Sequence, residues 1–361
     1  MYFFSYLLNQ CKKNLKREHL GGLNMSKSVM NSIEKIQMDI GFSGTFYAKS
    51  KENILTGSYG FANRSEKIKN QTNTRYAIAS GCKIFTSVAI CQLVEDGNIT
   101  FNTKVKECLD INFPHFDEEV TIHHLLTHTS GIPDYFDEDE MDDYEELWVS
   151  TPMYHIRKLK DFLPLFQNMK MKADVGGSFH YNNSAYIVLG LIVEQVSGLE
   201  FGDYIEKYIF QKIGMTESGY FEMDELPEGV ALGYIEKPDG SWKTNIYSLP
   251  VKSASDGGAY VTAKDMVVFW DALTNHQLLS KEMTRTLLTP HTEVAEDIYY
   301  GYGGYIETNR NGVVKYILMG YDPGVNFRTV YYPNTHLTIV VCSNESEGAY
   351  DMIKGIENII L

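Results

Sequence analysis

The sequence predicts an α+β fold in which one sheet is built from the two ends of the chain. Alternating apolar and polar residues, typical of strands, lie near the start and in the last hundred residues, whereas the middle has the apolar spacing of helices. With 361 residues and 43% hydrophobic content, the chain can bury the core of one large or two interleaved domains. We therefore expect a sheet with a mainly helical lobe inserted between its two halves.

The first hundred residues predict a helix, a hairpin and a second helix. Residues 30–40 have apolar side chains at helical spacing, and residues 44–62 alternate around a polar turn at 49–53. Residues 81–96 again repeat apolar side chains at helical spacing, and Gly97 follows as a common helix terminator. The second helix is therefore expected to be buried.

The middle of the chain continues with helical patterns, and the end returns to strands. Helices are predicted over 185–198 and 203–215. Strand candidates follow at 300–308, 312–321, 326–333 and 336–344, before a closing helix over 348–361. Strands from both ends then have to meet in one sheet, and a cleft between two such lobes commonly holds an active site.

We assign residues 25–361 to one domain, with an αβ lobe of about 25–75 and 255–361 and a helical lobe of about 76–254. Residues 1–24 are expected to be a non-native or disordered leader. The reason is that Gly21 and Gly22 can be encoded as a ribosome-binding purine tract shortly before Met25. An intact mass of natively expressed protein that retains this leader would contradict the assignment.

The composition excludes several classes of partner. The formal net charge is -15, from 32 basic and 47 acidic residues, and no basic cluster offsets it, so the chain repels phosphate backbones and anionic lipid. The apolar run at 2–8 is far shorter than the roughly 20 residues of a membrane helix. We expect no nucleic-acid partner and no stable membrane association.

The cysteines indicate a reducing compartment. Their number is odd, and their spacing fits neither a disulfide framework nor a zinc site. The five are Cys11, Cys82, Cys91, Cys108 and Cys342. A cytoplasmic location fits this pattern best.

Ser80 and Lys83 form a Ser-x-x-Lys motif at the start of the predicted helix over 81–96. Positions i and i+3 share a helix face, so the side chains can touch, and a lysine of lowered pKa can supply the base that a serine nucleophile requires. The motif alone is weak evidence, because a second copy occurs at Ser32 and Lys35. Context separates the copies, since Lys35 belongs to the polar face of its helix whereas Lys83 begins an apolar element.

Six segments of the chain, in order, resemble the penicillin-recognising serine hydrolases, the group of class C β-lactamases, D-Ala-D-Ala peptidases and related esterases. They lie between Gly41 and Asn344 and include TRYAIASGCKIFTSVAICQLVEDGNITFNTKV, VTIHHLLTHTSGIPDY and FHYNNSAYIVLGLIVEQVSG. The resemblance implies a β-lactamase/transpeptidase-like fold, in which an antiparallel sheet is flanked by helices and carries an inserted, mainly helical lobe.

The resemblance also implies roles for individual residues. The first family motif falls on Ser80 and Lys83, as acylated nucleophile and as its base or proton relay. The Tyr-x-Asn motif falls on Tyr181 and Asn183. Tyr181 would share proton transfer with Lys83, and Asn183 would bind substrate or hold Lys83, which suits a phenol and an amide.

The third motif departs from the family pattern. The family has a basic residue, a small residue and a glycine, and the equivalent residues here are Leu318, Met319 and Gly320. Gly320 is retained, and the backbone N–H of Tyr321 can form an oxyanion hole with that of Ser80. A bond from the missing cation to a substrate carboxylate contributes roughly 1.5–3 kcal/mol, so its loss favours a neutral ester or amide over a carboxylate-bearing lactam. A degenerate binding protein would have the same gap.

Two further clusters have simpler structural interpretations. His123, His124 and His128 include an i, i+4 pair but lack the glutamate of a zinc motif, so packing is preferred over metal binding. The acidic run at 134–146 lacks calcium-loop spacing and is interpreted as a solvated loop near the cleft. Tyr135, Tyr302 and Tyr321 are candidates for the cleft walls.

These features together predict a serine hydrolase that forms an acyl-enzyme with a small ester or amide. Two alternatives remain open: a β-lactamase or D-Ala-D-Ala carboxypeptidase, and, in another class, a non-catalytic ligand-binding protein on the same fold. The expected partner is a small-molecule ester, amide or lactam, and no cofactor or metal is predicted.

Overall fold

The protein is described from a computed structural model, in which residues 23–141 and 143–361 are placed. An eight-stranded sheet dominates the fold, and every neighbouring pair of its strands is antiparallel. In spatial order the strands are β2 (Ile54–Tyr59), β1 (Gly44–Lys49), β14 (Leu337–Ser343), β13 (Val325–Tyr332), β12 (Gly312–Asp322), β11 (Tyr305–Asn309), β10 (Ile298–Tyr300) and β9 (Thr292–Ala295). Because β1 pairs with β14, the prediction that the two ends of the chain share one sheet is confirmed.

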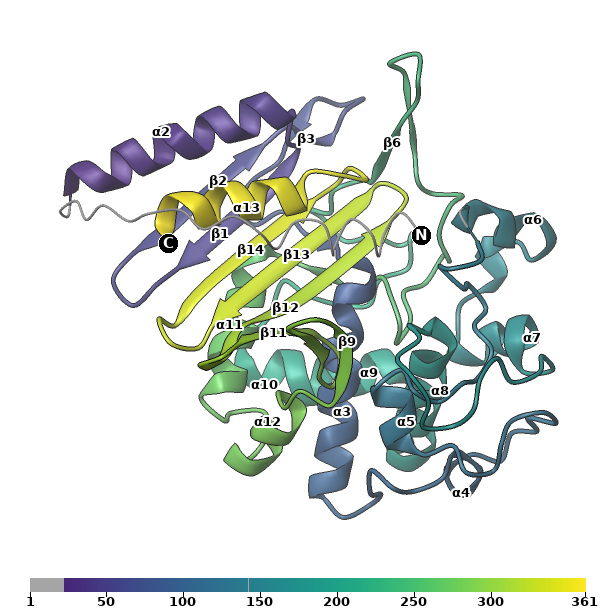
Figure 1. Cartoon of the computed structure of the whole chain (residues 1–361). Helices are drawn as coiled ribbons and strands as arrows, with labels where there is room; N and C mark the ends of the chain where they lie inside the picture. The colour runs from purple at the N-terminus through teal and green to yellow at the C-terminus, as the bar shows by residue number, and fades with distance from the viewer. Residues whose placement is uncertain (1–22, 142) are drawn as a thin grey trace.

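Two terminal helices cover one face of the sheet. They are α2 (Leu23–Ile40) and α13 (Ala349–Ile360), which pack against each other as well as on the strands (Figure 1). The side chains of Phe46, Ile339 and Ile353 are fully buried in this layer. Successive side chains of each strand point to opposite faces of the sheet, so alternate residues pack against these two helices and the others against the layer on the opposite face.

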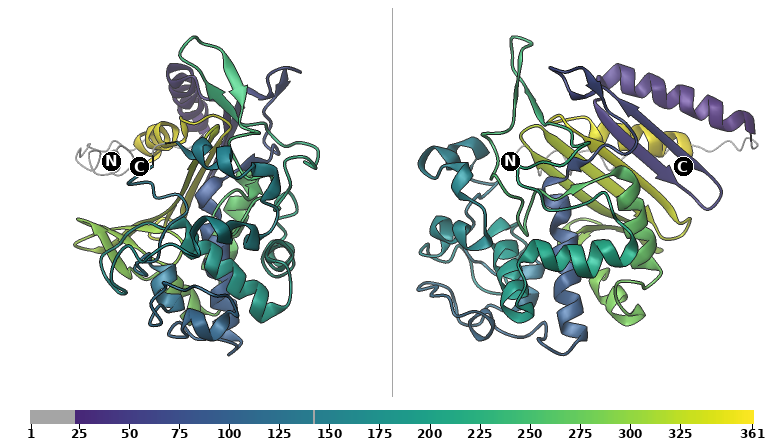
Figure 2. Two further views of the ribbon diagram at one scale, coloured as in Figure 1. Left: turned by 90° about the vertical axis from the view of Figure 1, so that its right-hand side faces the viewer. Right: turned by 180° about the vertical axis from the view of Figure 1, so that it is seen from behind.

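The opposite face of the sheet carries the buried helix that follows Ser80. This helix, α3 (Lys83–Glu95), and α11 (Ala263–Thr274) lie behind the sheet in Figure 1, and Figure 2 shows the sheet edge-on between the two layers. Trp270 of α11 is fully buried, and its indole N–H donates to Thr329 of β13 at 3.1 Å. The core on this side continues without a break into the helical region.

The helical region is built around α8 (Asn183–Ser197), which ends at Gly198 in the left-handed conformation that commonly terminates helices. The segment predicted as one helix over 203–215 has three parts, α9 (Phe201–Ile205), a π-helical stretch η5 (Glu206–Phe210) and α10 (Gln211–Ile213). The periodicity thus located the helix but not its π-helical middle.

The remaining elements are short and connect these layers. They are β3 (Phe61–Asn63), β4 (Ile68–Lys69), β5 (Tyr76–Ala77), η1 (Ala79–Cys82), α4 (Val105–Cys108), α5 (Ile122–Leu126), η2 (Tyr144–Glu146), α6 (Leu147–Ser150), η3 (Met153–His155), η4 (Leu159–Phe162), α7 (Leu163–Phe166), β6 (Tyr234–Glu236), β7 (Trp242–Thr244), β8 (Tyr260–Val261) and α12 (Lys281–Leu287). The hairpin of β6 and β7 projects from the top of the molecule in Figure 1.

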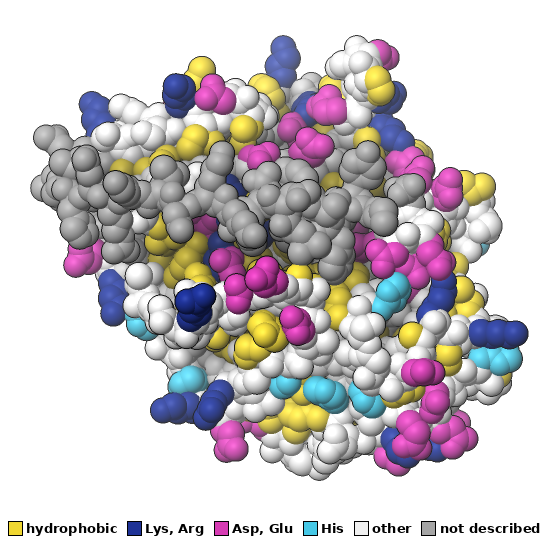
Figure 3. All heavy atoms as spheres, viewed as in Figure 1, with side chains coloured by type: hydrophobic (Ala, Val, Ile, Leu, Met, Phe, Trp, Pro, Cys, Tyr) yellow, Lys and Arg dark blue, Asp and Glu magenta, His cyan; other side chains and the backbone are white. Residues whose placement is uncertain are grey.

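Several expectations concern the chain as a whole. Most of the leader predicted over 1–24 lies outside the described residues, and the division into two lobes stays a prediction. Within the described ranges no single helix is long and apolar enough to cross a membrane, and one bent pair, Asn183–Ser197 with Phe201–Ile213, passes that test only by length and composition. Acidic side chains are spread over the face in Figure 3, as the net charge of -15 leads one to expect.

Candidate active site

Ser80 lies in the 3-10 turn η1, directly before α3. The residue before it, Ala79, has a φ of 44°, a left-handed conformation that costs a non-glycine residue about 1–3 kcal/mol. Backbone hydrogen bonds on either side hold the turn, from Ile78 N to Ala259 O at 2.9 Å and from Gly258 N to Ala79 O at 3.1 Å. The sheet and the 257–259 segment thus present Ser80 in a strained, supported turn.

Lys83 opens α3 and is buried, with 1% of its surface exposed. Its Nζ lies 2.9 Å from Ser80 Oγ, 2.9 Å from Asn183 Oδ1 and 2.7 Å from the backbone O of Asp256. An ammonium has three N–H donors, so these three acceptors account for all of them. The two carbonyl oxygens only accept, so in a neutral amine they would take both N–H groups and leave the nitrogen lone pair facing Ser80 Oγ.

Tyr181 lies beside this pair, just before α8. Lys83 Nζ is 4.8 Å from the centre of its ring. Burial raises the pKa of Tyr181 well above its usual value, and the Glu138 carboxylate adds to the rise, while a hydrogen bond with the Ser80 side chain acts in the opposite direction. Tyr181 is therefore a neutral phenol in contact with the serine, and it can donate a proton.

Asn183 is held in one orientation by its surroundings. Its Oδ1 accepts from Lys83, and its amide nitrogen lies 3.4 Å from Asp134 Oδ2 and 3.2 Å from the backbone O of Phe136. Asp134 also accepts from the backbone N–H groups of Asn183 at 2.7 Å and Ser184 at 3.0 Å, at the N-terminus of α8. The structure thus brings Ser80, Lys83, Tyr181 and Asn183 together, as the motifs predicted.

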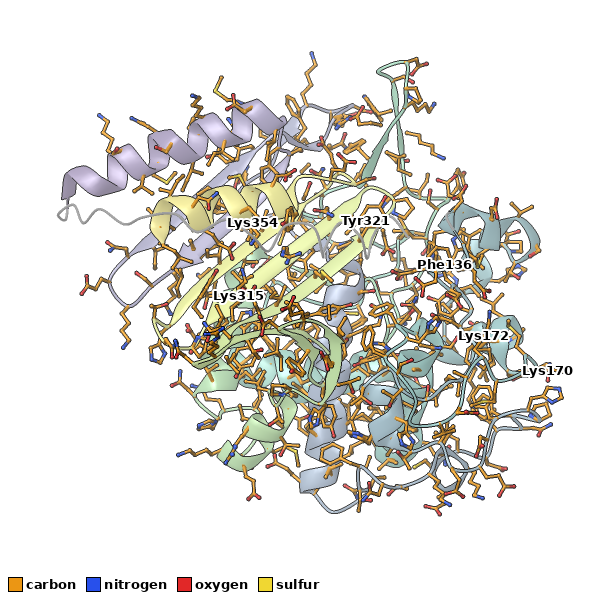
Figure 4. All side chains as sticks on the ribbon, in the orientation of Figure 1. Phe136, Lys170, Lys172, Lys315, Tyr321 and Lys354 are labelled. Carbon is orange, nitrogen blue, oxygen red and sulfur yellow. The ribbon has the colours of Figure 1, made fainter. Side chains whose placement is uncertain are left out.

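Strand β12 crosses directly over the Ser80 turn at Gly320. A Cβ at this position would lie 2.0 Å from Ile78 O and 2.9 Å from Ser80 N, so no other residue fits without moving the backbone. The next residue, Tyr321, is exposed and lines the cavity beside Ser80. Figure 4 shows Tyr321 at the end of the sheet strands and Phe136 facing it from the helical side.

Two residues expected at the site, Leu318 as a substrate-binding position and Tyr302 as a cleft wall, lie elsewhere. Leu318 is 2% exposed and packs into the core on the α3 side, against the backbone of Gly304, and it is absent from the cavity lining among the described residues. Tyr302 is also a core residue, whose hydroxyl bonds His123 Nδ1 at 2.9 Å and whose ring stacks on His291. The predicted placement of both side chains at the cavity is wrong, because their positions in the sequence do not show which neighbours cover them.

A cavity of about 820 Å³ opens around Ser80 between the sheet and the helical region. Tyr135 lines it as predicted, and Asp256, Asp322 and Glu138 line it as well. Burial raises the pKa of Asp322 to about 8, and Asp256 adds to the rise. Burial also raises the pKa of Asp256 and of Glu138.

Sequence reasoning missed three functional positions. Asp134 orients Asn183 and the start of α8, Asp256 accepts from Lys83 through its backbone O, and Asp322 lines the cavity. Asp134 lies in the family-like segment VTIHHLLTHTSGIPDY, which is the signal that could have found it, whereas Asp256 lies outside the family-like segments. Asp322 follows the third motif by two residues, and nothing else in the sequence marks it as a site residue.

A family model for β-lactamase matches residues 44–361. The chain belongs to the β-lactamase family. The structure of a penicillin-binding protein from Bacillus halodurans has a TM-score of 0.88 and 54% identity, covering 91% of this chain and 100% of that chain. Penicillin-binding protein 4* of Bacillus subtilis is 28% identical over 357 residues, or 93% of this chain and 76% of the relative. A D-stereospecific amidohydrolase from Streptomyces sp., 18% identical with a TM-score of 0.76, covers 90% of this chain and 97% of its own and shares the fold.

Membership of the β-lactamase family confirms the predicted resemblance and its fold. The antiparallel sheet with helices on both faces is the architecture that the resemblance implied. The relatives are named as penicillin-binding proteins and hydrolases, so this chain carries the fold and family of serine hydrolases.

The histidines of this β-lactamase family member are packing residues. The predicted i, i+4 pair does not share a helix face, because α5 ends at Leu126 and His128 has a φ of 57°. His124 Nδ1 accepts from Thr121 N at 3.2 Å, as part of a helix cap. His128 is buried, accepts from Asn182 N at 3.0 Å, and places its ring 4.5 Å from that of Tyr181.

The acidic segment 134–146 is only partly the solvated loop that was predicted, since Asp134 and Asp137 are each 4% exposed. Within the described ranges, Asp137, Asp139 and His180 are the group whose potential ligand atoms come within 4.8 Å of one another. The ring nitrogens of His180 lie 3.3 Å from Asp137 and 3.5 Å from Asp139, and Lys172 Nζ lies 3.6 Å from Asp137. These contacts, with the ammonium of Lys172 beside Asp137, give the cluster a sufficient structural explanation.

Proposed function

We propose that this protein is a serine hydrolase that cleaves a small ester or amide through an acyl-enzyme on Ser80. The observation that carries the proposal is the 2.9 Å contact between Lys83 Nζ and Ser80 Oγ on the floor of a cavity of about 820 Å³. A nucleophile within hydrogen-bond reach of an oriented base is the arrangement that covalent acyl transfer requires.

The proton transfers can be assigned to two side chains. Lys83 acts as the base in its neutral amine form, in which its two N–H groups are held by Asn183 and the Asp256 carbonyl and its lone pair faces Ser80. As Ser80 Oγ attacks the carbonyl carbon, its proton passes to that lone pair. Tyr181, a neutral phenol in contact with Ser80, donates to the departing alkoxide or amine and is reprotonated from Lys83. Water then attacks the acyl-enzyme, and the reverse transfers release the acid and restore the serine.

The oxyanion hole is assigned to the backbone N–H groups of Ser80 and Tyr321. Gly320 supports this assignment, since its missing side chain lets β12 lie against the Ser80 turn. Removing one donor of such a hole typically costs about a hundredfold to a thousandfold in kcat, so the contact between strand and turn matters for the rate.

A non-carboxylate substrate is preferred over penicillins or peptides with a free C-terminus. The residue in the place of the family's cation, Leu318, is apolar and buried, so it has no charge to offer a substrate carboxylate. The relatives named as penicillin-binding proteins keep the lactamase or carboxypeptidase alternative open. A non-catalytic binding protein is the remaining alternative.

The deciding experiment is labelling with a fluorophosphonate, followed by mass spectrometric mapping of the modified peptide. We expect one modification, on Ser80, and none in Ser80→Ala. Ser32→Ala is the matched control, because Ser32 belongs to the second Ser-x-x-Lys pair and is exposed. Absence of labelling by any acylating probe in the folded protein would support the binding protein, and rapid hydrolysis of penicillins would support the lactamase.

A further inference from the structure

The cavity beside Ser80 is lined by more carboxyl groups than the proposed chemistry uses. Asp256, Asp322 and Glu138 all line it, and none of the three forms an ion pair in the part of the chain that the structure describes. Asp256 accepts one hydrogen bond, from the hydroxyl of Tyr135. The carboxyl groups therefore lack a counter-charge of their own.

The cations of the cavity are already engaged. Lys83 directs its three donors at Ser80, Asn183 and Asp256 O. Of the lysines that line the cavity, Lys243 lies 2.7 Å from Glu145, and Lys252 lies 3.3 Å from Glu222. Among the described residues that line the cavity, no further lysine is left to pair with the three carboxyl groups, so an ammonium that pairs with them has to come from a bound molecule.

Asp322 is the best placed of these groups to meet a substrate. It follows Gly320 by two residues on β12, and alternate residues of a strand lie on the same face, about 7 Å apart. Gly320 lies against Ser80, so the Asp322 carboxyl lies about one pleat beyond the reacting carbonyl. Tyr144, Tyr260 and Tyr305 line the same cavity, and aromatic faces attract cations.

The electrostatics of the cavity agree with this geometry. The groups that face Asp322 are the carboxyls of Asp256 and Glu138, the ammonium of Lys83 and the phenols of Tyr144, Tyr260 and Tyr321. Burial raises the pKa of Asp322 to about 8, with Asp256 and Glu138 adding to the rise and Lys83 opposing it. A bound cation would favour the ionised carboxylate and displace this proton.

We propose that the substrate carries a cationic group within a few bonds of the scissile carbonyl, and that Asp322, with Asp256 and Glu138, selects it. This inference rests on the proposed function of Ser80. The proposed function says only that the site lacks a cation to bind a substrate carboxylate. This inference adds that the site prefers substrates that carry a positive charge.

Two pairs of esters test the proposal, each pair differing only in charge. The first places the charge in the acyl group, with the 4-nitrophenyl esters of 4-(trimethylammonio)butanoate and of its carbon isostere, 5,5-dimethylhexanoate. The second places it in the alcohol, with acetylcholine and 3,3-dimethylbutyl acetate. The quantity measured is kcat/KM of each ester divided by its rate constant for hydrolysis by hydroxide.

In at least one pair we expect the wild type to prefer the cationic ester by about tenfold or more, as for a charge-assisted contact. Asp322→Asn should reduce that preference severalfold while the neutral ester is still hydrolysed. Asp110→Asn, an exposed position outside the cavity lining, removes the same charge and should leave the preference unchanged.

The pH dependence of the preference tests Asp322 further, because both trimethylammonium groups are permanently charged. A preference that rises from about pH 6.5 to about pH 8.5 in the wild type, and is flat in Asp322→Asn, reports ionisation of Asp322.

The outcomes separate this inference from the proposed function. Equal corrected values for cationic and neutral esters in both pairs overturn the cation preference but leave the Ser80 hydrolase intact. A preference that Asp322→Asn does not change, in a variant that folds as the wild type does by circular dichroism, overturns the role of Asp322. Failure of every ester together with failure of Ser80 labelling overturns the proposed function itself.

Discussion

Lys83 Nζ lies 2.9 Å from Ser80 Oγ and is 1% exposed, so the two side chains meet away from bulk solvent. The same spacing at Ser32 and Lys35 leaves both side chains exposed. Burial and the two carbonyl oxygens at Asn183 and Asp256 distinguish the first pair from the second.

Lys83→Met should lower kcat/KM for a neutral ester by about a hundredfold to ten-thousandfold, the usual contribution of a positioned acid or base. Methionine keeps much of the buried side-chain volume but has no proton to exchange. The measurement is steady-state hydrolysis of 4-nitrophenyl 5,5-dimethylhexanoate. Lys35→Met should have wild-type activity, and a Lys83→Met variant that kept at least a third of the wild-type rate would exclude Lys83 as the base.

Gly320→Ala should reduce the rate of acylation of Ser80, and it should also lower the free energy of unfolding. The added Cβ would lie 2.0 Å from Ile78 O, which forces β12 and the Ser80 turn apart, and overpacking of this kind costs about 1–3 kcal/mol. Fluorophosphonate labelling rates and urea unfolding measure the two effects. At Gly202 a Cβ would meet its nearest atom at 3.4 Å, so Gly202→Ala should change neither quantity much. Normal labelling kinetics in Gly320→Ala would contradict the assigned oxyanion hole.

Asp322→Asn should raise the melting temperature at about pH 8.5 and change it little at about pH 4. The folded protein keeps a proton on Asp322 up to about pH 8, whereas the unfolded chain releases it near pH 4, so the folded state binds more protons between these values. The free energy of unfolding of the wild type therefore falls as the pH rises through this window. The Asp322→Asn variant has no carboxyl group to ionise at this position, so it should not show this fall. Thermal unfolding across the window measures the effect, and an identical shift at both ends would argue against a raised pKa.

Lys315→Met should destabilise the fold by at most about 3–5 kcal/mol, since it removes the nearer of the two ammonium partners of the buried Glu357 carboxylate. The other partner, Lys354 Nζ, lies 3.1 Å from Glu357 Oε2 and remains. Lys315 is 4% exposed and its Nζ lies 2.7 Å from Glu357 Oε1 of α13, on the outer face of the sheet, where Figure 4 labels Lys315 and Lys354. Adding Glu357→Leu should recover most of the loss. Urea unfolding of Lys315→Met, Glu357→Leu and the double variant gives the coupling free energy between the two side chains. If the losses of the single variants add up in the double variant, the two side chains are not coupled.

Local patterns in the sequence determined the elements and the first catalytic contact. Apolar spacing located α3 and α8, alternation located β12 to β14, and three residues of separation placed Ser80 and Lys83 on one turn. These features depend on neighbours along the chain, which the sequence shows directly. The six family-like segments then led from elements to fold and family.

The tertiary structure alone decided what surrounds that contact. Lys83 meets Asp256 across 173 residues of chain, and Asp134 binds the backbone of Asn183 across 49. Leu318 and Asp322 lie on one strand, yet the first packs in the core and the second lines the cavity. Burial, pKa and charge in the cavity arise from the packing of distant segments, and no spacing along the chain contains that information.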